Sequence, residues 1–159
     1  MKLNNSFIQS LAILVMLAEL PEGSALKSQE ISKRMEVSPT YLLKIAKKLK
    51  DAGLINSSAS KNGGYTIKKD IREISFLDVF EAVDENTTFL DKLDLNPIHN
   101  MFLSEALVKE KELVVKQILL AAEAEYKQTL AKHFVDEIAP KSNDGKTLEI
   151  DWKQIISED

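Results

Sequence analysis

The sequence predicts a mainly helical fold with one small β-hairpin. Short segments with helical spacing of apolar residues fill most of the first half of the chain, and a longer helical segment follows in the second half. Between them, a polar stretch with turn-forming residues separates two short β-prone segments. The 159 residues, 44% hydrophobic and 29% charged, are typical of one globular domain with an appended element.

The first predicted helix covers residues 5–20, with Asn5 or Ser6 as its N-cap, and the Pro-Glu-Gly after it ends the helix. The apolar run Leu11–Ala18 has the length of a signal-peptide core, but a single lysine precedes it and no small-x-small cleavage site follows. We therefore expect a buried helix. No stretch approaches the roughly 20 apolar residues of a membrane span, so we expect a cytoplasmic protein without membrane contact.

Two short helices joined by a tight turn come next. Ser28 opens the first, and Glu30 lies in its first turn, where a carboxylate complements the helix dipole. Ser38 caps the second, Pro39 occupies its first position, and Gly53 ends it. A buried stripe is predicted for its apolar residues at helical spacing, Leu42, Ile45, Ala46 and Leu49. Together the two helices form a helix-turn-helix pattern.

A β-hairpin is predicted directly after this pair. Its strands are Leu54–Ile55 and Tyr65–Ile67, and Asn62-Gly63-Gly64 supplies the turn. A hairpin in this position is the wing of a winged helix-turn-helix domain, which we assign to residues 1–86. Its last helix starts at Ser75, which with Asp78 approximates a capping box.

The remaining chain is predicted as a connecting loop (87–103), one long helix (104–138) and a C-terminal tail (139–159). The centre of the long helix is apolar nearly all round, so it must be covered on more than one side. We expect a second copy of the chain to cover it, because twofold pairing is the commonest solution; the alternative is burial in its own chain. The predicted dimer interface is Leu107, Val114, Ile118, Ala121 and Ala122. In the tail, Asp151 either caps a short helix or belongs to a mobile arm.

Positive charge is concentrated in one part of an acidic chain. Residues 27–72 contain eleven basic and four acidic side chains, although the whole chain carries a net charge of −4. Such a segment is typical of a protein that binds a polyanion, and the alternative is a lysine-rich solvated face. On the second helix of the pair, Thr40, Lys44, Lys47 and Asp51 lie opposite the buried stripe, with Tyr41, Leu43 and Lys48 on its flanks, as in a helix that enters the major groove. The candidate DNA contacts are Ser28, Ser38, Thr40, Tyr41, Lys44, Lys47, Lys48, Lys61, Asn62, Gly63 and Gly64.

The sequence lacks the residues that several kinds of chemistry require. The chain has no cysteine, which excludes disulfides, thiolate-held clusters and cysteine nucleophiles. Its two histidines, His99 and His133, are far apart in sequence, so we expect no metal site and no cofactor. No glycine-rich phosphate loop follows a strand, and no histidine pairs with a nucleophile, so an enzyme is not expected. The alternative to a DNA-binding regulator is a winged-helix module that binds protein.

Three blocks of the sequence resemble the Rrf-two family of bacterial winged-helix regulators: Val37–Ile55, Ser57–Asp70 and Glu73–Glu85. The resemblance implies a homodimer that binds a pseudo-palindromic operator in double-stranded DNA. We expect the protein to be a repressor that blocks polymerase by occupying this operator. It places the recognition helix at Ser38–Lys50 and the wing at Ser57–Tyr65.

The chain also departs from that family. Tyr41-Leu42-Leu43-Lys44 stands where relatives often have Tyr-Leu-Glu-Gln, and Ala59 replaces a frequent wing arginine, so we expect a different operator sequence. The family's sensors carry three cysteines in the region Asn86–Leu103, which here has none, so the chain resembles the cysteine-free branch. Its effector is left open among a small molecule, a partner protein or none, and His99 in this region is interpreted as an ordinary surface or packing residue.

Overall fold

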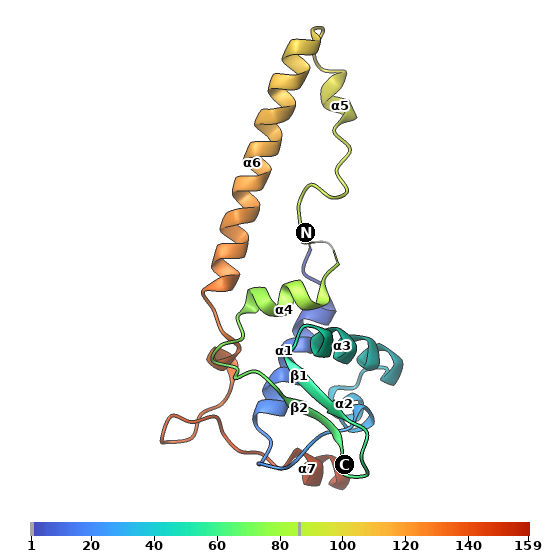
Figure 1. Cartoon of the computed structure of the whole chain (residues 1–159), viewed down its shortest axis with the longest axis vertical. Coiled ribbons are helices and arrows are strands. Elements are labelled where there is room, and N and C mark those ends of the chain that lie inside the picture. Colours follow the sequence, from blue (N-terminus) through green and yellow to red (C-terminus); the bar gives the residue numbers. More distant parts are fainter. Residues whose placement is uncertain (1, 86) are drawn as a thin grey trace.

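A long helix projects from a body of short helices and one β-hairpin (Figure 1). The computed structural model describes residues 2–85 and 87–159. Its elements are α1 (Asn5–Ala18), α2 (Ser28–Met35), α3 (Pro39–Asp51), β1 (Ile55–Ser58), β2 (Gly64–Ile67), α4 (Phe76–Val83), α5 (Asn96–His99), α6 (Glu105–Ala131), the 3₁₀-helix η1 (Val135–Ile138) and α7 (Trp152–Glu158). The predicted fold class, mainly helical with a two-stranded antiparallel wing, is confirmed. The predicted domain boundary at Asn86 lies outside the described residues.

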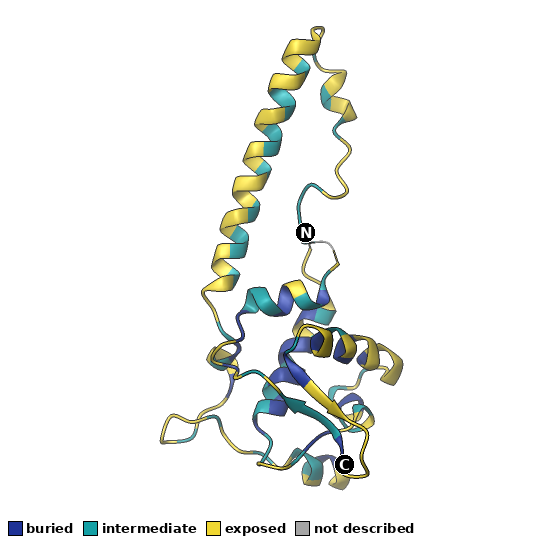
Figure 2. Ribbon diagram, in the orientation of Figure 1, coloured by how far each residue is buried: buried dark blue, intermediate teal, exposed yellow. Residues whose placement is uncertain are grey.

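The hydrophobic core lies between α1, α3 and α4, as the buried segments of Figure 2 show. Leu14 of α1, Leu42 of α3 and Phe80 of α4 are all fully buried there. The predicted stripe of α3 is confirmed, because all four of its residues are buried. Among the described residues, no helix combines the length and hydrophobicity that crossing a membrane requires.

Capping side chains fix where α3 and α4 begin. The Ser38 hydroxyl accepts a hydrogen bond from the Tyr41 amide at 3.4 Å. At α4, Ser75 Oγ accepts from the Asp78 amide at 3.0 Å, and Asp78 Oδ2 accepts from the Ser75 amide at 2.9 Å. This reciprocal pair is the predicted capping box, with aspartate in place of glutamate.

Two predicted caps are shifted by one or two residues. The N-cap of α1 is Asn4, whose Oδ1 accepts from the Ser6 amide at 3.0 Å, rather than Asn5 or Ser6 themselves. Ser28 is the first residue inside α2, and Lys27 precedes it as the N-cap. Glu30 Oε1 accepts from the Lys27 amide at 2.9 Å, so the glutamate carboxylate caps this helix in place of the serine hydroxyl.

The hairpin is pinned to the loop before α2. Ile55 pairs with Ile67 and Ser58 with Gly64 in the antiparallel register. Leu26 then bonds to the other edge of β2: its amide donates to the Tyr65 carbonyl at 3.1 Å, and the Tyr65 amide donates back at 2.7 Å. The base of the wing therefore has strand-like partners on both sides.

The long helix is shorter than predicted, because it ends at Ala131 and not at residue 138. Beyond it, the Val135 amide donates to the Ile74 carbonyl at 2.9 Å, and the Asp136 amide donates to the Ile71 carbonyl at 3.2 Å. Val135 is 0% exposed. A continued helix would keep these amides for itself and carry Val135 away from the core, so burial of this valine turns the chain back into the body.

Residues 87–104 run beside α6 and include the short helix α5, which the sequence did not predict (Figure 1). The Phe89 amide donates to Glu123 Oε1 at 2.7 Å, and the ring of Phe89 meets that of Tyr126 edge-on at 6.4 Å. His99 Nε2 lies 2.7 Å from Glu112 Oε2. These contacts cover one side of α6, and every residue of the helix is either exposed or half-buried.

Candidate nucleic-acid interface

The solvent side of α3 presents the polar residues that the helical wheel predicted. Thr40, Lys44 and Lys47 are exposed on the side opposite the buried stripe, and Tyr41 and Leu43 are exposed beside them. The stripe holds the helix on the body, so these side chains project from a fixed backbone. A helix that is anchored behind and polar in front can lie in the major groove.

The lysines of this face differ in their own partners. Lys47 Nζ lies 2.7 Å from Asp51 Oδ2, but both side chains are well exposed, and such a pair contributes little. Lys48 Nζ donates to the Val83 carbonyl at 3.2 Å and lies 3.3 Å from Glu85 Oε1, so this lysine links α3 to the end of α4. Lys44 has no ion pair within the described residues and is the cation most available to a phosphate.

An open groove of about 600 Å³ runs along this side of α3. Tyr41, Lys44 and Lys47 form one wall, while Asn4 at the start of α1 and Lys92 from the loop after α4 lie across from them. Three acidic residues, Asp51, Asp84 and Glu85, also line it. The groove therefore joins the lysine-bearing face of α3 to the start of α1 and the end of α4.

The wing residues divide into an exposed tip and a packed base. Lys61 and Asn62 are exposed, whereas Gly63 is buried and Gly64 is half-buried. A Cβ on Gly63 would lie 2.3 Å from the Ser58 carbonyl oxygen, and one on Gly64 would lie 2.5 Å from that of Leu26. Close backbone packing therefore explains both glycines, and of the predicted wing contacts Lys61 and Asn62 are the ones whose side chains are open to a ligand.

Ser28 and Ser38, the two remaining predicted contacts, lie at helix starts. Ser28 is half-buried in the first turn of α2, and the exposed Ser38 uses its hydroxyl oxygen to cap α3. The structure thus brings Ser38, Thr40, Tyr41, Lys44 and Lys47 together on one helix. Lys48 is the member of the predicted set whose ammonium group is held by another element.

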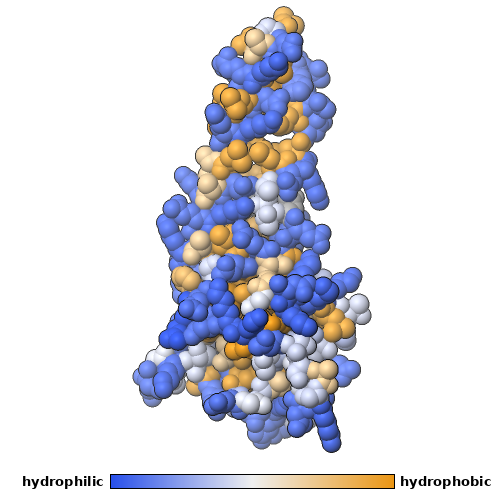
Figure 3. Space-filling view, viewed as in Figure 1, coloured by the Kyte–Doolittle hydropathy of each residue, from blue (hydrophilic) through white to orange (hydrophobic). Residues whose placement is uncertain are grey.

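Four of the five predicted dimer residues occupy one side of α6 at spacings of seven, four and three. Leu107, Val114, Ile118 and Ala121, together the arm face, are all exposed, and Ile118 is 63% exposed. Ala122 is also exposed but is rotated away from this line. Hydrophobic patches on the projecting part of the molecule are visible in Figure 3.

The histidines serve as ion-pair partners rather than as a joint site. His99 lies against Glu112, and His133 Nδ1 lies 2.9 Å from Glu137 Oε1. In residues 2–85 and 87–159, no group of three or more His, Asp or Glu side chains is arranged to hold a metal ion. Sequence reasoning missed that His99 ties α5 to α6, because the pairing depends on a loop folding back along the helix.

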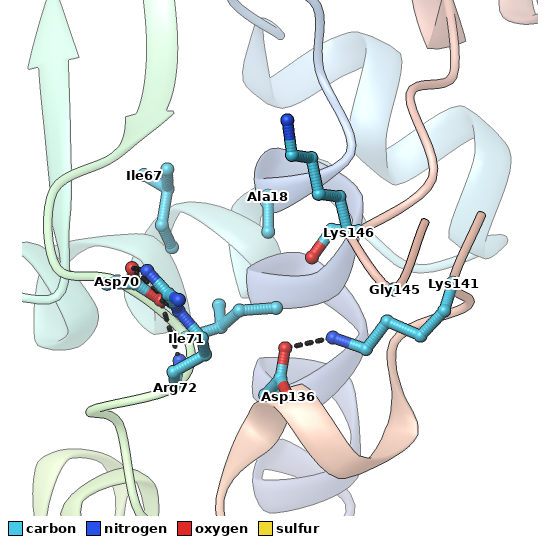
Figure 4. A pocket seen from close by; sticks show the side chains of 10 residues that line it. Ala18, Ile67, Asp70, Ile71, Arg72, Asp136, Lys141, Gly145 and Lys146 are labelled. Atoms are coloured by element: carbon cyan, nitrogen blue, oxygen red, sulfur yellow. Dashed lines mark hydrogen bonds and ion pairs between the residues drawn. The ribbon is translucent and has the colours of Figure 1, made fainter. Parts of the chain in front are cut away.

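A second cavity, of about 480 Å³, lies between α1, the chain after β2 and residues 136–147 (Figure 4). Arg72 Nη2 lies 2.6 Å from Asp70 Oδ2 at one edge, and Lys141 pairs with Asp136 at another. The floor is apolar, with Ala18, Ile67 and Ile71. Sequence analysis did not predict it, because its walls come from three distant segments.

A wing beside a helix pair whose second member exposes cations defines a winged helix-turn-helix protein. Residues 3–141 match the Rrf2 family, described as an iron-dependent transcriptional regulator, and the chain belongs to this family. The predicted family is thereby confirmed.

Two curated relatives, each an HTH-type transcriptional regulator by name, align over 84 residues: YffB of Lactococcus lactis at 45% identity and YwgB of Bacillus subtilis at 38%. Both alignments cover 53% of this chain and 54% of the relative, so the chain spans about half the length of these proteins. Among solved structures, CymR, the global cysteine regulator of B. subtilis, superimposes with a TM-score of 0.60, covering 87% of this chain and 95% of CymR. The two sequences are 18% identical, so the similarity is one of fold.

The iron in the family description does not fit this chain. An iron–sulfur cluster needs cysteine thiolates, and the sequence contains no cysteine. The carboxylates and histidines in the described parts of the chain do not gather as a substitute site. Any signal that the protein senses therefore acts through other residues.

Proposed function

We propose that this chain is a dimeric, sequence-specific DNA-binding transcriptional regulator that represses by occupying a pseudo-palindromic operator. The observation that carries the proposal is the outer face of α3, where Thr40, Lys44 and Lys47 are exposed on a helix fixed by four buried residues. The wing tip, with Lys61 and Asn62, supplies a second contact to the backbone or minor groove. Binding to a bacterial chromosome would place the protein in the cytoplasm.

The arm face supports the dimer part of the proposal. Its apolar residues are open to solvent in the single chain, and a second copy of α6 would cover them. A twofold axis between two such helices would place two copies of α3 on successive half-sites, about 34–36 Å apart along the duplex. The proposed dimer thus matches the proposed operator symmetry.

A second candidate, a winged-helix module that binds protein, is favoured by one observation. Leu43 is 49% exposed on the edge of the α3 face, where an apolar side chain suits a protein partner. The same leucine can also contact a thymine methyl group in the major groove. Electrostatics separates the two candidates, because only polyanion binding releases condensed counterions.

A salt titration tests the proposal. The wild-type protein would first select duplexes from a randomised 30-base-pair library, and affinity for the selected duplex would then be measured between about 50 and 200 mM salt. If several lysines contact phosphates, log Kd rises linearly with log salt at about 0.9 per contact. Failure to enrich any sequence, or affinity that does not change with salt, would contradict DNA recognition and favour the protein-binding candidate.

A further inference from the structure

The last twenty residues return across the body and end on the helix-turn-helix. This C-terminal strap, residues 140–159, begins beside η1, passes over the cavity of Figure 4 and finishes as α7, which packs against α2. The match to the Rrf2 family ends at residue 141 and so stops before α7. The sequence left a mobile arm and a capped helix as alternatives, and the structure shows the helix, with Asp151 Oδ1 accepting from the Gln154 amide at 3.1 Å.

The strap is attached to α1 through Glu19. The Ile150 amide donates to the Glu19 carbonyl at 2.7 Å, and the indole Nε1 of Trp152 donates to Glu19 Oε1 at 3.1 Å. Glu19 is 4% exposed. A buried acceptor that loses its donor is costly, so these hydrogen bonds hold the start of α7 at the end of α1.

The strap is attached to α2 by apolar packing and by one amide carbonyl. Ile156 is 4% exposed and belongs to the main hydrophobic core. Lys33 Nζ donates to the Ile156 carbonyl at 3.1 Å, and the Arg34 guanidinium lies 5.1 Å from the centre of the Trp152 ring. The cation–π contact between Arg34 and Trp152 and the burial of Ile156 thus both hold α7 against α2.

Two ion pairs at the margin of this contact add little. Arg34 Nη1 lies 3.4 Å from Asp159 Oδ2, and Lys153 Nζ lies 3.4 Å from Glu30 Oε1. Three of the four side chains are more than a third exposed, and pairs that are this exposed contribute little to stability. The attachment therefore depends on Trp152 and Ile156.

Helix α2 needs such support, because it is short and shallowly buried. Of its eight residues, Ile31 and Ser32 are buried. Isolated helices of fewer than about 12–15 residues are marginal in water, so α2 keeps its position through neighbours. Its neighbours are α3 on one side and α7 on the other.

We propose that the C-terminal strap completes the DNA-binding body: Trp152 and Ile156 are positioning residues that hold α2 against α3, and operator affinity depends on them although they contact no DNA. This proposal rests on the proposed DNA-binding function. It makes residues beyond the family-matched range part of the recognition unit.

The test compares Ile156→Asp with Gln154→Asp in the full-length chain. Both variants add one carboxylate to α7, but Ile156 is buried, whereas Gln154 is exposed and its side chain contacts Glu158 of the same helix at 3.2 Å, so the added charge is matched and docking is disturbed at Ile156. Trp152 is the single tryptophan of the chain, so acrylamide quenching of its fluorescence reports directly on undocking. The DNA probe is the duplex selected by the wild-type protein.

Ile156→Asp is expected to expose Trp152 to quencher and to weaken binding to that duplex at least fivefold, with an unchanged salt slope because the phosphate contacts are the same. Gln154→Asp should behave as wild type. If Trp152 becomes accessible while affinity is unchanged or improved, the proposal is wrong. If Ile156→Asp loses its overall helicity, Ile156→Ala replaces it, and affinity must then fall as quencher access rises. Binding of DNA by the wild-type protein tests the proposed function separately.

Discussion

The four lysines of α3 share one side-chain chemistry but have different surroundings. Lys44 has no ion pair in the described chain, Lys47 has a weak surface partner, and Lys48 is held by the end of α4. Lys50 is exposed but lies away from the line through Thr40, Lys44 and Lys47. The position of each ammonium group, rather than the number of lysines, therefore determines what α3 can offer to a phosphate.

Lys44→Ala and Lys47→Ala should each weaken binding to the selected duplex. Each loss of a phosphate contact should also reduce the slope of log Kd against log salt by about 0.9. The measurement is fluorescence anisotropy at several salt concentrations. Lys109→Ala on α6 removes the same charge from an exposed site on another helix and is the control. Equal slopes for all three variants would show that the outer face of α3 does not contact the DNA backbone.

Glu19 gives a second prediction at this scale, because it is a buried carboxyl group. Burial raises the pKa of Glu19, while its hydrogen bond from Trp152 acts in the opposite direction to a smaller extent. Because the pKa of Glu19 is higher in the folded chain than in the unfolded chain, this group stabilises the fold at pH values below its unfolded pKa. This contribution is lost as the pH rises through the pKa of the folded chain. At neutral pH the ionised carboxylate therefore costs stability.

Glu19→Gln keeps an oxygen for the Trp152 indole and removes the charge. The melting temperature of the variant should exceed that of wild type at pH 7, by about 2–4 °C if the penalty is about 1 kcal/mol, and the difference should vanish near pH 4. The ion pairs Arg34–Asp159 and Lys153–Glu30 are the same in both proteins. Glu22→Gln, at an exposed position, is the control. A variant less stable than wild type at pH 7 would show that the carboxylate is needed in its ionised form.

At the scale of elements, features set by residues close in sequence were predicted correctly, whereas features set by contacts between distant segments were not. Ser38 and Ser75 marked helix starts because a cap involves residues three apart, and the outer face of α3 followed from helical periodicity. The end of α6 could not be predicted, since it depends on the amides of Val135 and Asp136 meeting the carbonyls of Ile74 and Ile71, about sixty residues earlier. The docking of α7 depends likewise on Glu19 at the other end of the chain.

The wing supplies a prediction at this scale. Gly64 has φ +142°, and a Cβ there would lie 2.5 Å from the Leu26 carbonyl oxygen, so Gly64→Ala must displace backbone. Gly23→Ala is the matched control, because Gly23 also has positive φ (+78°) but no atom within 4 Å of the added Cβ. Gly23→Ala should cost about 1 kcal/mol of unfolding free energy, and Gly64→Ala clearly more. Urea unfolding measures both, and similar losses would refute the close-packing explanation of Gly64.

At the scale of the whole molecule, the long helix is joined to the DNA-binding body at its C-terminal end (Figure 1). Phe89 and Tyr126 pack together near its base, and the chain after it re-enters the core at Val135. The Phe76 amide at the start of α4 donates to the His133 carbonyl at 2.8 Å. A second subunit bound to the arm face would therefore be fixed relative to α4, and through α4 relative to α3.

The dimer prediction follows from this arrangement. Ile118→Glu places a carboxylate in the centre of the arm face, where pairing would bury it, so the variant should elute as a monomer of 17.9 kDa while wild type has about twice that mass. Lys109→Glu is the control, because nine residues place it on the opposite side of α6. Light scattering coupled to size-exclusion chromatography measures the mass. Operator affinity should fall with the dimer, since one α3 then reads one half-site. A dimeric Ile118→Glu protein would place the subunit interface elsewhere on the molecule.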